Sequence, residues 1–218
     1  GFSQCYASAV RRITSRQNSV VAEFRAVARG GDHALVLLDG LHLVADALAA
    51  GCHLEHVVVA SDRSDDPDLA FLLEAAVRAG AETAIVSAPV MAAISPVRSP
   101  SPIVALARRP RLQDRMFEPR RPLVVIACDV QDPGNLGAIA RVVEGAGASG
   151  LMAAGQSADP FGWKAVRGSM GSALRLPIAV HAQADTAVAA ARARGCKIVA
   201  TVPRGGTSLF DADLTGPT

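Results

Sequence analysis

Short apolar runs alternate with amphipathic segments along the whole chain, and this alternation predicts an α/β protein. In the first half, the apolar runs that predict strands lie at 34–38, 56–60, 83–86 and 103–107. Helical spacing of apolar residues predicts helices at 15–28, 41–50, 69–79 and 90–94. Glycines follow three of these helices, as expected at helix ends.

A second series of strands and helices follows a basic segment. Its predicted strands are 123–128, 151–154, 176–180 and 197–201, and its predicted helices are 135–146, 160–168 and 183–193. The basic segment between the two series has no apolar periodicity and therefore resembles a linker. The pattern predicts an N-terminal domain at 1–108, a linker at 109–121 and a second domain at 122–218.

Charge is distributed unevenly along the chain. The whole chain carries a formal net charge of only +2. Residues 108–121 hold six arginines against two acidic residues. Such a segment is either a patch that contacts phosphates or a solvated linker, and the sequence leaves both readings open.

The cysteines and apolar runs limit the class of protein. The four cysteines are widely spaced and form no CxxC pair, so we expect reduced thiols. Cys52, His53 and His56 lack a second ligand pair, and we expect no metal site. No apolar run is long enough to cross a membrane, and the N-terminus does not have the pattern of a signal peptide. We therefore expect a cytoplasmic protein without membrane contact.

The turn from Asp129 to Arg141 is the strongest candidate site. It follows the apolar run 123–128, turns at Asp132-Pro-Gly134 and enters a helical pattern at Asn135. Open α/β proteins bind ligands at such turns, and a helix start favours an anion. We expect Arg141 to reach back over Gly137, which would leave open space there. The alternative is an N-cap Asn135 and a surface Arg141.

A nearby glycine run imitates a nucleotide-binding motif. Gly145-Ala-Gly-Ala-Ser-Gly150 matches G-x-G-x-x-G, but it follows a helix and precedes a strand. A dinucleotide site needs the reverse order. We therefore interpret these glycines as a helix end and a turn, and a nicotinamide dehydrogenase is not expected.

Two further segments carry weaker signals. Residues 159–177 combine Lys164, Arg167 and Arg175 with the small polar residue Ser169, and they could grip a sugar-phosphate. An amphipathic helix and loop would explain the same residues. The glycine-bearing loop Thr201–Gly206 follows the last predicted strand and is a possible ligand-binding turn.

Together these residues resemble the SpoU (TrmH) family of RNA ribose 2′-O-methyltransferases, in the SPOUT superfamily. Asn135, Gly137 and Arg141 match the first family motif, and the stretch Lys164–Gly171 with Leu176-Pro177 is similar to the middle region. The stretches 13–18 and 38–45 resemble the start of the family's N-terminal RNA-binding domain, which has a ribosomal-protein-like fold. The resemblance covers nearly the whole chain.

The resemblance implies S-adenosylmethionine as methyl donor, structured RNA as substrate, expected to be 23S-type rRNA or else tRNA, and a homodimer. It implies catalytic roles for Asn135 and Arg141, and it places Thr201, Pro203 and Gly205 on the cofactor side. With the basic residues above, the expected RNA contacts are Arg16, Arg108, Arg109, Arg111, Lys164, Arg167 and Ser169. The implied fold is a small α/β RNA-binding domain followed by an α/β SPOUT domain.

One departure from the family pattern affects the expected activity. The family's second motif, a Gly-Glu-Gly at a strand end, and its third, a Ser-Leu-Asn, are not found in these 218 residues. We therefore expect a truncated knot region and weak cofactor binding. The alternatives are an RNA-binding module without catalysis and a small-molecule α/β enzyme.

Overall fold

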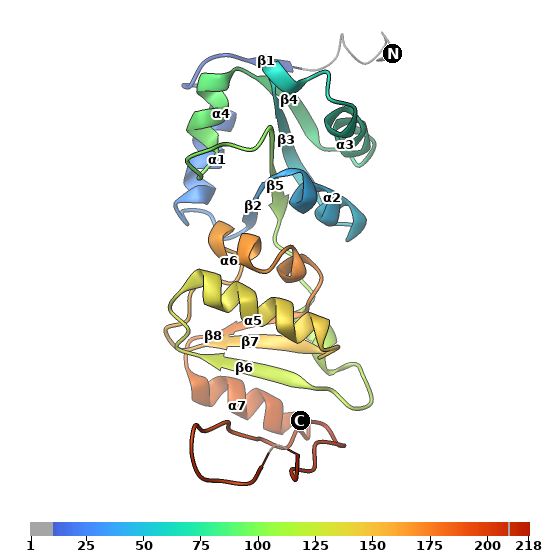
Figure 1. The fold of residues 1–218 in the computed structure, drawn as a ribbon, viewed down its shortest axis with the longest axis vertical. Helices are drawn as coiled ribbons and strands as arrows, with labels where there is room; N and C mark the ends of the chain where they lie inside the picture. Colours follow the sequence, from blue (N-terminus) through green and yellow to red (C-terminus); the bar gives the residue numbers. More distant parts are fainter. Residues whose placement is uncertain (1–10, 209) are drawn as a thin grey trace.

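The computed structural model describes residues 11–208 and 210–218. They contain two sheets with their helices, which follow one another along the long axis of the molecule (Figure 1). The first series of elements is β1 (Arg11–Ile13), α1 (Ser19–Ala28), β2 (Leu35–Asp39), α2 (Leu41–Ala49), β3 (Leu54–Ala60), α3 (Pro67–Arg78), β4 (Glu82–Val86), α4 (Ala88–Ile94) and β5 (Ile103–Arg108). The second is β6 (Val124–Cys128), α5 (Pro133–Gly145), β7 (Gly150–Ala154), α6 (Trp163–Gly168), β8 (Ile178–His181) and α7 (Ala184–Ala193). The α/β class expected from the sequence is confirmed.

The first sheet has the order β1-β4-β3-β5-β2. Strands β1, β4 and β3 run parallel, whereas β5 runs antiparallel to both of its neighbours. Apolar residues of α1 and α4 cover one face of this sheet, and those of α2 and α3 cover the other. We call residues 11–108 the N-terminal part.

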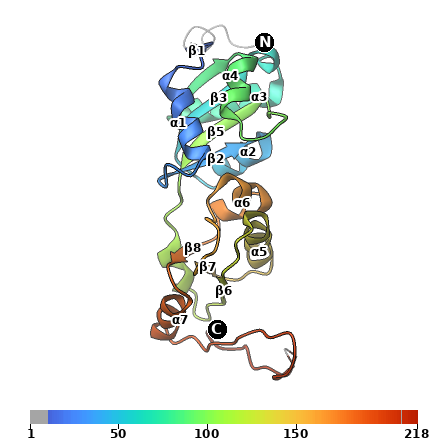
Figure 2. The same cartoon turned by 90° about the vertical axis from the view of Figure 1, so that its left-hand side faces the viewer.

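The second sheet has three parallel strands in the order β6-β7-β8. Helices α5 and α6 pack on one face and α7 on the other. Figure 2 shows α6 between this sheet and the N-terminal part. One apolar cluster is shared by both parts: it includes Leu38 and Leu54 from the first sheet, Leu151 from the second sheet, and Leu136 from α5. We call residues 122–218 the C-terminal part.

The connecting segment 109–121 is anchored rather than simply solvated. It contains a 3₁₀ turn, Gln113–Phe117, in which Met116 is buried against Met152 of β7. Gly150 at the start of β7 leaves the room that the Met116 side chain needs. An apolar anchor inside an arginine-rich segment escapes a search for periodicity, because it is a single residue.

Two predictions about elements were wrong, and one strand was not predicted. Residues 197–201 form no strand: no neighbouring strand pairs with them in the part of the chain that the structure describes, although Lys197 N donates to Pro217 O at 2.9 Å. The first helix begins at Ser19 rather than at Ser15, because the Asn18 side chain caps it by accepting from Val20 N. The short strand β1 was missed, since three residues are too few to show a period.

The interpretation of Gly145–Gly150 is confirmed. Helix α5 ends at Gly145, Gly147 turns with φ +73°, and Gly150 begins β7. Within the described residues, no helix combines the length and the apolar character that a bilayer crossing requires.

Candidate active site at the carboxyl edge of the parallel sheet

The carboxyl ends of β6, β7 and β8 meet at one edge of the second sheet, because these strands are parallel. Ligands of open α/β sheets bind at this kind of edge. The loop after β6, residues 129–132, leads into α5, and the loop after β7, residues 155–162, leads into α6. The candidate residues Asn135 and Arg141 lie on α5.

Asp129 ties the two loops together. It is one of two described non-glycine residues with positive φ, at +55°, and its Oδ1 accepts a hydrogen bond from Gln156 N at 2.8 Å. A side chain at Gly155 would overlap this carboxylate, so the contact requires glycine there. Val130 N donates to Ser157 Oγ at 3.1 Å, which adds a second link. The start of α5 is therefore held by the neighbouring loop.

Asp132 caps α5. Its side chain accepts a hydrogen bond from Asn135 N at 2.7 Å, and Pro133 follows in the first turn. The alternative reading of Asn135 as an N-cap is therefore wrong, because Asp132 holds that position. The Asn135 side chain is exposed at the start of the helix and is available to a ligand.

Gly137 has a different role from the one expected. It does not leave space for Arg141: it is buried, and a Cβ there would overlap the carbonyl oxygen of Ala165 and crowd Ser169 N. The glycine lets α5 and α6 approach at backbone distance. Gly168 makes the matching approach from α6, with Gly134 O only 3.1 Å from the position of its Cβ.

Arg141 lies in the middle of α5 and is exposed. Among the described residues, no hydrogen bond or ion pair engages its guanidinium, so its donors face solvent. On the packed helix α6, Lys164 and Arg167 are also exposed. Lys164 Nζ lies 5.5 Å from the ring centroid of Trp163. Exposed basic side chains on two packed helices offer contacts to phosphates.

Ser169 was predicted to bind RNA, and the structure contradicts this. Its side chain is fully buried, its hydroxyl donates to Val166 O at 2.8 Å, and it accepts from Ala173 N at 3.2 Å. Both capacities of the hydroxyl are therefore used to close the turn after α6. A small polar residue beside basic ones looks like a binding residue until its burial is known.

The arginines expected to bind RNA in the connecting segment differ in their surroundings. Arg108 pairs with Glu55, and the Arg108 hydrogen bond lowers the pKa of that carboxylate. Arg109 pairs with Asp159 of the C-terminal part, and its side chain is only 19% exposed, so most of its donors are engaged within the chain. Arg111 is exposed. In the N-terminal part, Arg16 is exposed and donates to Pro89 O at 3.1 Å.

The predicted cofactor residues lie in the segment after α7. Thr201, Pro203 and Gly205 are exposed and lie outside regular structure, with Gly205 at φ +76°. The expectation that this segment leaves a strand end is wrong, since no strand precedes it.

Metal binding finds no support in the described ranges. No group of three or more His, Cys, Asp or Glu side chains there is arranged to hold an ion. Cys52, Cys128 and Cys196 are free thiols, as predicted, and Cys5 lies outside the described residues. Burial raises the pKa of both Cys52 and Cys196, which keeps these thiols protonated.

The sequence placed Asp129 and Asp132 in the candidate turn but did not reveal their roles. Asp132 had a detectable signal, since an Asp before Pro at a strand-to-helix turn is typical of an N-cap. Asp129 had none, because its contact with Gln156 spans 27 residues of sequence.

Comparisons with known proteins agree on one family. Residues 122–218 match the family described as the SpoU rRNA methylase family, and residues 31–105 match the MRM3-like substrate binding domain. An uncharacterized tRNA/rRNA methyltransferase from Synechocystis is 30% identical over 97% of this chain and 77% of its own. The 23S rRNA (guanosine(2553)-2′-O)-methyltransferase of Bacillus subtilis is 25% identical over 90% of this chain and 75% of its own. The crystal structure of an AdoMet-bound rRNA methyltransferase from Sinorhizobium meliloti superimposes with a TM-score of 0.78 at 29% identity, covering 94% of this chain and 77% of that one.

Proposed function

Because the chain belongs to the SpoU rRNA methylase family, we propose that it methylates a ribose 2′-hydroxyl of structured RNA, with S-adenosylmethionine as methyl donor. The substrate class is 23S-type rRNA, since the Bacillus subtilis relative is named for that activity. The donor follows from the AdoMet-bound Sinorhizobium meliloti enzyme. A cytoplasmic location and a homodimer belong to the same proposal. Val142 of α5, 69% exposed beside Arg141, is an apolar side chain that a second copy would cover.

One observation carries the proposal: Asn135 and Arg141 are both exposed on the helix that begins at the carboxyl edge of the parallel sheet. Asp132 caps that helix with its own carboxylate, so Asn135 does not serve as the cap. Arg141 has its donors in solvent, where a ribose oxygen or a phosphate can accept from them. The two residues thus form the substrate side of a site.

Arg141 acts by orienting groups and by stabilising charge. Ribose methylation needs the 2′-oxygen held in line with the methyl group while negative charge develops on that oxygen. A guanidinium stays protonated in proteins, so it donates hydrogen bonds and does not remove the proton. It binds the oxygen and the adjacent phosphate with a planar set of donors. Alignment of this kind provides much of the rate gain, with effective molarities of roughly 10⁵ M.

RNA recognition uses the N-terminal part. Arg16 lies beyond the end of β1, at the edge where β1, β4 and β3 end together. Lys164 and Arg167 of α6 add exposed positive charge in the C-terminal part. Folded RNA is recognised through its shape and through phosphate contacts, which suits basic residues on two separate surfaces.

The test is methyl transfer to rRNA from donor carrying a labelled methyl group. Replacement Arg141→Ala should lower the rate by about 10² or more, the usual cost of losing one donor to a developing oxyanion. Arg192→Ala on α7 is the control, since Arg192 is equally exposed but lies on the opposite face of the sheet. The label should appear in alkali-resistant dinucleotides, because a 2′-O-methyl group blocks cleavage at that ribose.

Two results would count against the proposal. Label on a base rather than on a ribose would refute the reaction. RNA binding without any methyl transfer would favour the alternative of an RNA-binding module. In that case Arg141→Ala would weaken RNA binding without affecting any turnover.

A further inference from the structure

Two arginines make the main polar links between the N-terminal and C-terminal parts. Arg109 begins the connecting segment, and its backbone N–H donates to Ala34 O of the N-terminal part at 2.8 Å. Counting Arg109 with that part, every ion pair that joins the two parts within the described residues involves Arg109, its partner Asp159, or Arg175. The sequence suggested Arg109 as an RNA contact and Arg175 as part of a sugar-phosphate grip, but in the structure both are paired with carboxylates of the chain. Both sit beside the apolar contact between the two parts.

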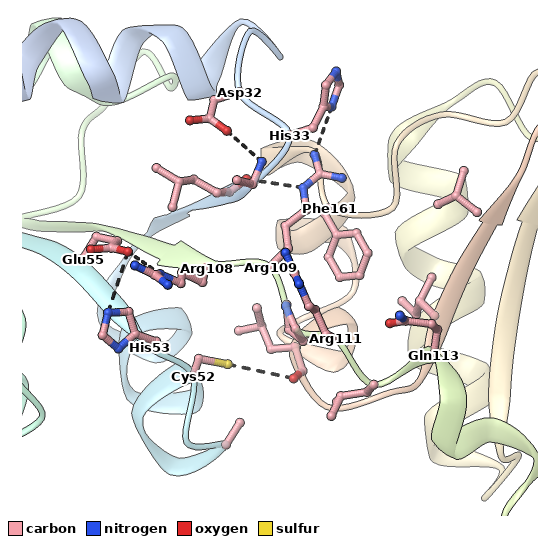
Figure 3. A pocket seen from close by; sticks show the side chains of 18 of the residues that line it. Asp32, His33, Cys52, His53, Glu55, Arg108, Arg109, Arg111, Gln113 and Phe161 are labelled. Carbon is pink, nitrogen blue, oxygen red and sulfur yellow. Dashed lines mark hydrogen bonds and ion pairs between the residues drawn. The ribbon is translucent and has the colours of Figure 1, made fainter.

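Arg109 follows the last residue of β5 and contacts Asp159 and Phe161; we call this contact the Arg109 clamp. Its guanidinium donates two hydrogen bonds to Asp159, one of them Nη1 to Oδ1 at 3.0 Å, in a bidentate arrangement. It also lies 5.2 Å from the ring centroid of Phe161. Figure 3 shows Arg109 between His33 and Phe161, at a groove of about 1210 Å³ between the parts. The linked residues precede α6, so this clamp fixes the loop that leads into α6.

Arg175 contacts Glu144 of α5 and Asp46 of α2; we call this contact the Arg175 clamp. Arg175 Nε and Nη2 donate to the two oxygens of Glu144 at 2.8 and 3.0 Å, and Nη1 lies 3.5 Å from Asp46 Oδ2 of α2. Gly171, at φ +80°, lets Asp46 approach, since a side chain there would overlap that carboxylate. Glu144 lies three residues after Arg141 on α5. One guanidinium therefore joins the helix of the candidate site to a helix of the N-terminal part.

Apolar contacts fill the space between the clamps. Leu174 and Ala173, from the turn before β8, belong to the same buried cluster as Val44 and Ala47 of α2. Cys52 Sγ lies 4.0 Å from Leu174 O. An apolar contact is not directional, so by itself it permits sliding between the parts. The bidentate contact of Arg109 with Asp159 and the ion pair of Arg175 with Asp46, at two separated points, restrict that freedom.

We propose that Arg109 and Arg175 are positioning residues, which hold the N-terminal part in one orientation relative to α5 and thereby fix the RNA-contacting residues relative to Asn135 and Arg141. The predicted effect on RNA binding rests on the proposed function. The predicted fixed orientation of the two parts does not depend on it. Two such parts move relative to one another unless contacts at their interface restrict the motion. The two clamps restrict that motion, so the two parts keep one relative orientation.

Distance measurement tests the clamp directly. Fluorescent donor and acceptor dyes are attached through unnatural amino acids at the exposed positions Ala22 and Ala189 of the full chain, which leaves its cysteines in place. Energy transfer then reports the separation between α1 and α7. We expect a narrow distance distribution in the parent chain and a broad one in Arg109→Ala and in Arg175→Ala. Arg78→Ala is the control, because Arg78 pairs with Glu74 inside α3. Unchanged distributions in both clamp variants would overturn the proposal.

RNA binding tests the consequence of a fixed orientation. Replacement of the acidic partners distinguishes a positioning role of the arginines from direct contact with RNA. Loss of either arginine should weaken binding of structured rRNA by about tenfold, or ~1.4 kcal/mol. Asp159→Asn and Asp46→Asn should also weaken binding, although each removes a negative charge. If these two variants instead bind RNA more tightly, the arginines contact RNA directly and the positioning role is refuted.

Kinetics separates positioning from catalysis. The KM for RNA should rise by about tenfold in Arg175→Ala while kcat stays near the parent value, because Arg141 is untouched. Arg175→Lys should recover only part of the loss, since an ammonium cannot make the bidentate contact. A fall in kcat with an unchanged KM would contradict the proposal. A parent chain without methyl transfer would refute the proposed function, and the distance measurement would still decide on the clamp.

Discussion

At the residue scale, the local surroundings of a side chain divide the basic and polar residues into two groups. Arg141, Lys164 and Arg167 are exposed and remain available to RNA. Arg109 and Ser169, which look equally suitable in the sequence, are committed to contacts inside the chain. Residue type alone therefore does not distinguish a binding residue from a structural one.

Gly137 gives a prediction about packing. Gly137→Ala should lower the free energy of unfolding by about 1–3 kcal/mol, because the added methyl group overlaps the backbone at Ala165 and forces α5 away from α6. Urea unfolding followed by circular dichroism measures the change.

A second glycine on the same helix is the matched control. At Gly145 a Cβ would meet no atom within 4 Å, so Gly145→Ala should be neutral or stabilise by up to ~1 kcal/mol. Equal effects at the two positions would show that helix propensity, rather than the approach of α6, explains Gly137.

At the element scale, contacts with neighbours decide whether a segment becomes regular and where it stands. Residues 197–201 have the apolar content of a strand but no strand beside them in the structure, and they stay irregular. Helix α5 is fixed at three points: its cap at Asp132, its close contact with α6 at Gly137, and its ion pair at Glu144. These contacts keep Asn135 and Arg141 in a constant geometry.

The ion pair at Glu144 predicts a pH dependence of stability. Burial opposes ionisation of Glu144, but hydrogen bonds, chiefly from Arg175, outweigh it and hold the pKa below its ordinary value near 4.5. A lowered pKa in the folded state contributes stability above about pH 4.5, and this contribution is lost as the pH falls through the folded value. At pH 7 the free energy of unfolding should be higher for the parent chain than for Glu144→Gln. The difference should be up to ~1 kcal/mol, because the pair is partly exposed.

Unfolding measured from pH 7 down to pH 3 tests this. The difference between the parent and Glu144→Gln should shrink towards pH 3. Glu74→Gln is the comparison, since Glu74 pairs only within its own helix. A difference that grows on acidification would show the opposite sign of the shift.

At the scale of the whole molecule, two sheets with separate strand orders share one apolar cluster. Side chains of α2 and of the turn before β8 meet in it, and the two arginine clamps lie beside it. A shared core couples the stability of the two parts. The packing of the two parts then fixes the distance between their RNA-contacting surfaces.

This coupling predicts a single cooperative unfolding transition. Differential scanning calorimetry should give one peak, with a calorimetric enthalpy close to the van't Hoff enthalpy. Two resolved peaks would show that the parts unfold independently. Leu38 and Leu136 lie in the shared cluster, so replacement of either by alanine should shift the one peak as a whole.

The sequence by itself determined the α/β class, most of the elements and the residues worth testing at the site. Local patterns carry this information, because helix and strand periods, caps and turn glycines act over a few residues. The order of strand, polar turn and helix around Asn135 was enough to locate the candidate site. The reverse order at Gly145–Gly150 was enough to discount a nucleotide motif.

Only the tertiary structure decided which polar residues are free. The contact of Asp129 with Gln156, the clamp of Arg109 on Asp159 and the pairing of Arg175 with Asp46 join residues that are far apart in the chain. Burial of Ser169 and the close approach at Gly137 likewise depend on how α6 packs. No local period encodes such contacts, since their energy arises only when distant segments meet. The turn at Asp129–Arg141 was thus visible in the sequence, whereas its orientation towards the N-terminal part was fixed by packing and by two arginines.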